Sequence, residues 1–196
     1  MNERILSTVK KRIYELIIEY IKQRKQEVSG YLEQIKGTCM VSFLCDPNSL
    51  VREVSLMVLY KLIETYKETE DIIKPADLVI KLLDEIKLRN PAATVKGAIW
   101  QLIGLLHASY NKQVSIYIEE SQDVQYEMLM DQVKAKQPEI KAIIGMLKGY
   151  VHSFQVECTL TEPQRSGLFL ILKTLIAPIQ DVQNKGVIKA AMKLLS

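Results

Sequence analysis

Glycine and proline are scarce in this chain, whose 196 residues include 8 glycines and 6 prolines. Turn dipeptides between short alternating segments are also rare, which argues against a sheet-rich fold. No apolar run approaches the roughly 18–20 residues of a membrane-spanning helix, and the N-terminus lacks the pattern of a secretory leader. These absences favour an all-α protein without a membrane partner.

Cysteine is sparse as well, with Cys39, Cys45 and Cys158 as its three occurrences. An odd number without metal-ligand spacing predicts reduced, mostly buried thiols in an intracellular protein. The formal net charge of +3 is too small to indicate a nucleic-acid partner by itself.

Signatures of catalysis are missing. The chain has no zinc-protease, redox or hydrolase motif, no glycine-rich phosphate loop, and none of the protein-kinase loops. The two histidines, His107 and His152, stand 45 residues apart with no other ligand type recurring beside them. We interpret them as equivalent positions in a repeat rather than as a metal pair. The sequence therefore predicts no catalytic residue, no cofactor and no metal site.

The chain does contain a strongly amphipathic stretch at residues 90–106. Its apolar residues recur at steps of four, three and four: Val95, Ile99, Leu102 and Leu106. This spacing places them on one face of an α-helix. Asn90 is a candidate N-cap for that helix, and Pro91 suits its first turn.

The same pattern recurs in five units, each with an apolar anchor followed by a basic residue. The anchors are separated by 42, 44, 45 and 48 residues, close to the period of about 40–47 residues of HEAT and armadillo repeats. The anchor pairs are Val9-Lys10, Val51-Arg52, Val95-Lys96, Ile140-Lys141 and Ile188-Lys189. We expect the basic residues to form a ladder between repeats.

The periodicity predicts an all-α, α-α superhelix of about four and a half HEAT-like helix pairs. We expect one array over residues 1–196, with repeats at 4–44, 46–88, 90–136, 138–177 and an incomplete one at 184–196. Because a helix pair buries its apolar faces against its neighbours, the unpaired last helix suggests a piece of a longer solenoid. A capping box at Thr161 and Gln164 is expected to start a helix at 163–177.

Each unit is expected to bury its own apolar stripe. In the first unit this stripe consists of Val9, Ile13, Leu16 and Tyr20. In the second unit Ser55 is the single polar interruption. Trp100 is expected in the core or between repeats, and Gly145 and Gly149 are expected to allow close helix packing.

Two basic clusters in the first helix and its exit are candidate DNA-phosphate contacts. They consist of Lys10, Lys11, Arg12, Lys22, Arg24 and Lys25. Nearby glutamates offset most of this charge, so a solvated polar face is the alternative. Ser121-Gln122, in acidic surroundings, is either a phosphorylation site or an ordinary exposed loop.

Several segments resemble, in order and separation, the N-terminal helical-repeat region of the DNA-dependent members of the phosphatidylinositol 3-kinase-related kinase family. These segments are Glu33-Gln34-Ile35-Lys36-Gly37-Thr38-Cys39, Leu78-Val79-Ile80-Lys81-Leu82-Leu83, Leu102-Ile103-Gly104-Leu105-Leu106 and Met146-Leu147-Lys148-Gly149-Tyr150. The resemblance implies a nuclear, curved solenoid that helps to encircle a broken DNA end held by the Ku heterodimer. It also implies contact with other repeats of the same polypeptide, a role in non-homologous end joining, and a kinase domain far away.

Two other classes of function stay open. One is a stand-alone HEAT or armadillo adaptor that binds a peptide or a carrier protein. The other, an all-α enzyme, is disfavoured because no cluster of acid, base or nucleophile is visible. Salt-dependent binding to DNA ends would separate the scaffold from the adaptor.

Overall fold

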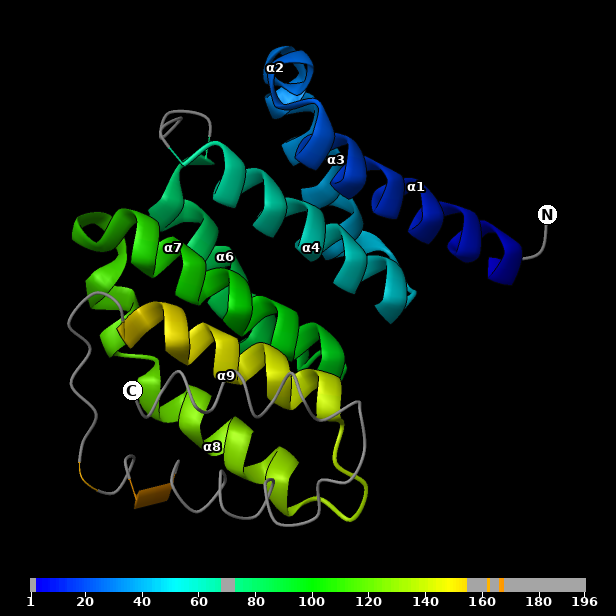
Figure 1. Cartoon of the computed structure of the whole chain (residues 1–196). Coiled ribbons are helices and arrows are strands. Elements are labelled where there is room, and N and C mark those ends of the chain that lie inside the picture. The colour runs from blue at the N-terminus through cyan, green and yellow to red at the C-terminus, as the bar shows by residue number, and fades with distance from the viewer. Residues whose placement is uncertain (1–2, 68–72, 155–161, 163–165, 168–196) are drawn as a thin grey trace.

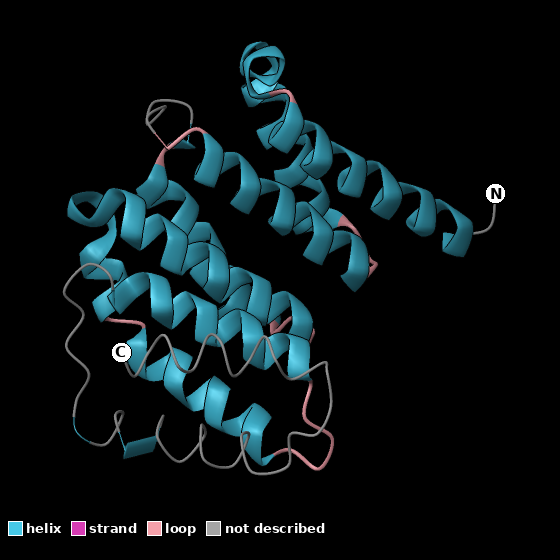
Figure 2. Ribbon diagram, in the orientation of Figure 1, coloured by secondary structure: helices cyan, strands magenta, loops and turns pink. Residues whose placement is uncertain are grey.

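The computed structural model describes residues 3–67 and 73–154, together with 162, 166 and 167. This part of the chain consists of helices and the turns between them, without a strand (Figures 1 and 2). The predicted all-α fold class is therefore confirmed. The helices expected at 163–177 and 184–196, the capping box at Thr161 and the anchor at Ile188 lie outside the described residues.

The helices are α1 (Glu3–Gln23), α2 (Lys25–Val28), α3 (Leu32–Cys45), α4 (Ser49–Thr65), α6 (Pro75–Arg89), α7 (Ala93–Glu119), α8 (Gln122–Lys134) and α9 (Ile140–Phe154). A single 3₁₀ turn, Ser29–Tyr31, connects α2 to α3. Helix α7 is kinked at Tyr110, where φ is −136° and ψ is 39°.

The helices form two layers (Figure 1). The first helices of the repeats lie next to one another in the order α1, α4, α7 and α9. Helices α3, α6 and α8 form the second layer, and they pack on α4, α7 and α9 respectively. Each of these pairs is joined by a short turn that contains a proline, which keeps its two helices close together.

Helices α7 and α9 approach each other most closely because glycines line their contact. A Cβ added to Gly97 would lie 2.7 Å from the Cα of Ala142, and one added to Gly104 would lie 2.6 Å from the Cα of Gly149. Both pairs are 45 residues apart, the same separation as the anchors Val95 and Ile140. The glycines thus let equivalent positions of successive repeats touch, as expected for Gly145 and Gly149.

The predicted stripes of the second and third units are buried. Val51, Val58 and Leu62 in α4 are at most 1% exposed. Val95, Ile99, Leu102 and Leu106 in α7 are fully buried. Ser55 fits this interior because its hydroxyl donates to the carbonyl of Arg52 at 2.7 Å. In α9 the stripe is less complete, since Ile140 and Ile144 are only partly buried.

The predicted core face of α1 is wrong. The expected stripe of Val9, Ile13, Leu16 and Tyr20 is 49–58% exposed. The buried residues are Tyr14 and Ile21, which lie on a different face of the helix. Helix α1 is apolar over more than half of its circumference, so periodicity alone could not show which part packs against α4.

Asn90 does not cap the start of α7. It adopts the left-handed conformation, with φ 44° and ψ 61°, and ends α6 instead. Its side-chain oxygen accepts from the Lys96 ammonium at 2.5 Å, and α7 begins at Ala93 without a side-chain cap. The equivalent role before α4 belongs to Asn48, whose Oδ1 accepts from the backbone N–H groups of Leu50 and Val51.

Candidate nucleic-acid interface

The six basic residues predicted to contact phosphate lie along α1 and at its junction with α2. Within the described part of the chain, each of them has a partner. Lys10 pairs with Asp46 at 2.7 Å, and both Lys11 and Arg12 pair with Glu15. Lys22 pairs with Glu19 at 2.7 Å. Arg24 pairs with Glu27, and the Lys25 ammonium lies 5.7 Å from the centroid of the Tyr66 ring.

The structure does not join these residues into one patch. Lys10, Lys11 and Arg12 point to different sides of α1, because consecutive helical residues are about 100° apart. Lys22 lies three turns further along, about 18 Å from Lys10 at 1.5 Å per residue. The hydrogen bond from Arg12 lowers the pKa of Glu15, and the one to Asp46 raises the pKa of Lys10. These ion pairs offset most of the positive charge on α1, although Lys11 and Arg12 share one acid.

The bases that follow the anchors bind different partners rather than one another. Lys10 ties α1 to Asp46 at the start of the next repeat. Arg52 contacts Glu85 and donates to the Phe43 carbonyl at 2.8 Å. Lys141 of α9 contacts Glu53 of α4, which bridges two repeats that flank α7. The predicted ladder is therefore a set of separate ties, and those of Lys10 to Asp46, Arg52 to Phe43 and Lys141 to Glu53 cross between repeats.

A second group of basic residues gathers where α6 and α8 end and where α7 and α9 begin. We call it the turn edge. It comprises Lys87, Arg89, Lys96, Lys134, Lys136 and Lys141. The same stretches, residues 87–96 and 131–141, contain only two acids, Asp131 and Glu139.

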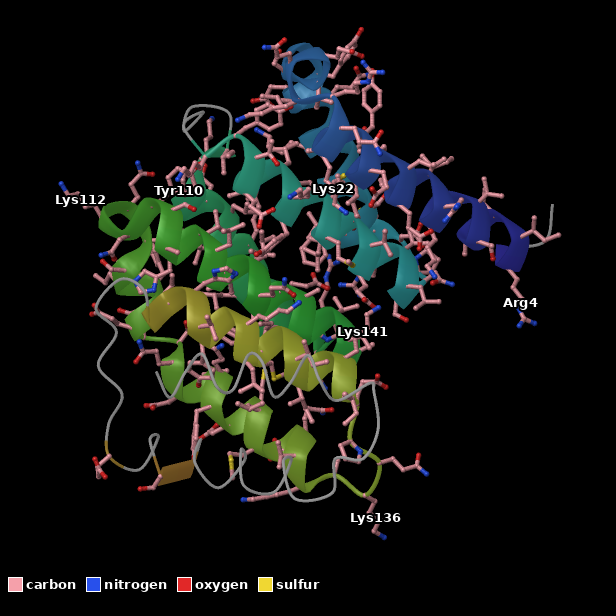
Figure 3. All side chains as sticks on the ribbon, viewed as in Figure 1. Arg4, Lys22, Tyr110, Lys112, Lys136 and Lys141 are labelled. Atoms are coloured by element: carbon pink, nitrogen blue, oxygen red, sulfur yellow. The ribbon has the colours of Figure 1, made fainter. Side chains whose placement is uncertain are left out.

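Contacts between elements bring these residues to one side of the molecule. Gly97 touches Ala142, so Lys96 and Lys141 start adjacent helices at the same level. The Arg89 guanidinium donates to the Leu44 carbonyl at 2.7 Å, which links this edge to the end of α3. Figure 3 shows Lys136 and Lys141 on the same side of the view, opposite Lys112.

Asp131 and Glu139 are exposed, but the acids that pair with bases near the turn edge are largely withdrawn from solvent. Asp46, Glu53 and Glu85 have side chains that are 2–4% exposed, and each one faces a basic partner. Lys87, Lys134 and Lys136 are exposed and have no acidic partner among the residues that the structure describes. The solvent-facing charge of this edge is therefore positive, which suits phosphate oxygens.

The opposite edge has the reverse balance. Residues 64–67 and 112–123 carry four acids, Glu64, Glu119, Glu120 and Asp123, and only two bases, Lys67 and Lys112. Lys67 belongs to this edge because its carbonyl accepts from the Tyr110 hydroxyl at 2.6 Å. Lys25 also lies at this edge, over the Tyr66 ring, so the excess of acid belongs to the ends of α4 and α7.

Sequence reasoning missed the turn edge because its bases are spread over about 55 residues and do not form a run. A usable signal was present, since bases recur at the second-helix ends and first-helix starts of successive units. That signal becomes a surface only when the repeats stack in register.

Most of the other residues singled out in the sequence analysis are buried or hydrogen-bonded within the fold. Trp100 is 1% exposed, as expected for a core residue. Ser121, expected in an exposed loop, is 2% exposed, and its hydroxyl donates to the Ile118 carbonyl. His107 is buried beside Asn111, and His152 hydrogen-bonds Tyr60 at 2.9 Å, so the two rings have separate partners.

Cys45 is exposed, contrary to expectation. Burial raises the pKa of the Cys39 thiol to about 12, which keeps it protonated.

Neither a metal site nor a membrane span is found in the described residues. No group of three or more histidine, cysteine, aspartate or glutamate side chains there is arranged to hold an ion. No helix among those residues has the length and hydropathy needed to cross a bilayer.

The fold and the surface define an all-α, helical-repeat type of protein. The chain belongs to the family described as DNA-PKcs, N-terminal, whose model matches residues 1–196. This finding confirms the resemblance to the DNA-dependent kinases of the phosphatidylinositol 3-kinase-related group. No individual curated protein matches the chain.

Proposed function

We propose that this chain is a non-catalytic N-terminal scaffold segment of a nuclear DNA-dependent serine/threonine protein kinase. In this proposal it helps to position Ku-bound DNA ends during double-strand-break repair by non-homologous end joining. Membership of the DNA-PKcs N-terminal family supports the kinase context. The positive turn edge, opposite an acidic edge, is the observation that supports a direct contact with DNA.

The mechanism we propose is geometric. Residues 1–196 form one HEAT-like array, part of a longer solenoid whose other repeats belong to the same polypeptide. Contacts between positions 45 residues apart in α7 and α9 support this stacking. The ties of Lys10 to Asp46 and of Lys141 to Glu53 would hold the repeats at fixed angles, so that the array acts as a shaped wall.

Two sets of residues differ in their expected contribution to phosphate binding. Lys87, Lys134 and Lys136 can contact phosphate without breaking an ion pair, so they carry the main contact. The clusters at Lys10–Arg12 and Lys22–Lys25 contribute less, because all of these residues except Lys25, which lies over the Tyr66 ring, must first leave an acidic partner. They stay candidate secondary contacts.

The test measures binding of the 196-residue chain to a fluorescent blunt-ended duplex by anisotropy over a range of salt concentrations. We expect the double variant Lys134→Ala/Lys136→Ala to weaken binding and to lower the salt slope by up to about 2, one unit for each lost phosphate contact. The matched control Lys67→Ala/Lys112→Ala removes the same charge from the opposite edge and should leave the slope unchanged.

Two results would contradict this proposal. One is equal weakening by both double variants, which would mean that only net charge matters. The other is the absence of binding even at low salt, which would favour the alternative of a stand-alone HEAT or armadillo adaptor. That alternative draws support from the exposed apolar face of α1.

A further inference from the structure

Helix α1 has an apolar face that the other described residues leave open. Leu6, Val9, Ile13, Leu16 and Tyr20 are between 37% and 58% exposed. A shallow groove follows this face and is lined by α1 alone. The opposite part of the helix packs on α4 through Tyr14 and Ile21. In Figure 1, α1 lies at the outer margin of the helical layers, with no described helix beyond it.

The open face has the spacing of a coiled-coil seam. Its residues follow one another at steps of three, four, three and four, from Leu6 to Tyr20. This 3-4 alternation keeps side chains on a line that a second helix can follow with knobs-into-holes packing. The second and third units show no such exposed seam, because their stripes are buried.

The charged residues beside the seam are arranged so that they would pair with the same residues of a second, antiparallel copy. Arg12 and Glu19 lie on the same flank, seven residues apart; both are exposed, and each forms one surface ion pair within α1, with Glu15 and Lys22 respectively. In an antiparallel pair of identical helices, each flank faces the same flank of its partner. Arg12 of one copy then meets Glu19 of the other, and symmetry repeats the pair. A uniformly acidic or basic partner would find one attractive and one repulsive charge on this flank.

We propose that the open face of α1 binds α1 of a second copy of this chain, in an antiparallel two-helix interface. The seam supplies the apolar contact, and the two Arg12–Glu19 pairs set the direction. A single helix pair buries less than the roughly 1,200–2,000 Å² of a standard interface, so the association is weak. This inference is independent of the DNA contact at the turn edge.

The test measures molar mass by size-exclusion chromatography with light scattering, from about 1 to about 200 μM chain, a range that spans the expected micromolar dissociation constant. Wild type should change from monomer to dimer within this range. Leu16→Glu should weaken dimerisation at least about tenfold, because it places a charge in the seam. Leu88→Glu is the matched control, since Leu88 on α6 is 80% exposed and lies off the seam.

The charge pairs give a second, independent readout. Arg12→Glu and Glu19→Arg should each weaken the dimer, and the double variant should restore it, while circular dichroism shows unchanged helicity for all three. A chain that stays monomeric throughout the range overturns the proposal. So does equal weakening by Leu16→Glu and Leu88→Glu, or a double variant weaker than either single one.

Discussion

Helices α1 and α7 have similar apolar patterns but very different surroundings. In α7 the stripe from Val95 to Leu106 is fully buried between α4, α6 and α9. In α1 the corresponding stripe from Val9 to Tyr20 is about half exposed. The comparison shows that a repeat pattern identifies a helix which packs on neighbours, while its position in the array decides whether the neighbour is present.

The two regions also differ in how closely their helices approach. Backbone contacts join α7 to α9 through Gly97, Gly104 and Gly149. Helix α1 instead meets its neighbours through long side chains and ties such as Tyr14 to Ser42 and Lys10 to Asp46. The α7–α9 pair should therefore be the more sensitive to added volume, and α1 the more tolerant.

The largest difference is expected when equivalent leucines become charged. Leu102→Asp removes a fully buried side chain and buries an unpaired carboxylate, which should cost about 4 kcal/mol or more and lower Tm by about 10 °C or more. Leu16→Asp, at 58% exposure, should change the stability by less than about 0.5 kcal/mol. Thermal melts followed by circular dichroism, at a concentration where the chain is monomeric, measure both. An unchanged Tm for Leu102→Asp would refute the helix phase assigned to α7.

An intermediate effect is expected at the glycine contacts. Gly104→Ala would place its Cβ 2.6 Å from the Cα of Gly149, so the two backbones must separate. Such overpacking costs about 1–3 kcal/mol. At Gly37 in α3 a Cβ meets nothing within 4 Å, so Gly37→Ala should instead stabilise the chain by about 0.5–1 kcal/mol. Urea unfolding curves give both values, and a stabilising Gly104→Ala would show that α7 and α9 are not in close contact.

The smallest effect concerns His107 in the buried part of α7. Burial lowers the pKa of His107 below its ordinary value of 6.5. The unfolded chain therefore takes up this proton at a higher pH than the folded chain, and stability falls as the pH drops below about 6.5. The variant His107→Gln should not show this loss of stability at low pH, because it has no imidazole to protonate. Urea unfolding at about pH 7.5 and about pH 5.0 measures it, and an identical acid sensitivity in both proteins would contradict the assignment.

Much of the fold could be predicted from local sequence, and some of the errors have clear causes. The apolar stripes of α4 and α7 were correctly predicted to be buried, because these helices have neighbours on several sides. Helix α1 was misread because it has two apolar faces, and the more regular one is not the one that packs. Asn90 was misread because the same residue type suits both helix starts and left-handed helix ends.

The candidate interface was less predictable than the fold. Runs such as Lys10-Lys11-Arg12 are easy to find in a sequence, but a helix turns their side chains to different sides and gives them acidic partners. Lys87, Lys136 and Lys141 are far apart along the chain, and the stacking of α7 on α9 brings their turns together. Whether a base is free depends on which acids fold against it, as Glu53 does with Lys141.

The sequence by itself determined that this chain is helical and which family it belongs to, because these follow from local periodicity and from residue order. Only the tertiary structure decided which face of α1 is buried, that glycines bring α7 onto α9, and that positive charge collects at one edge. These features depend on contacts between residues that are far apart in the sequence, which no local pattern specifies.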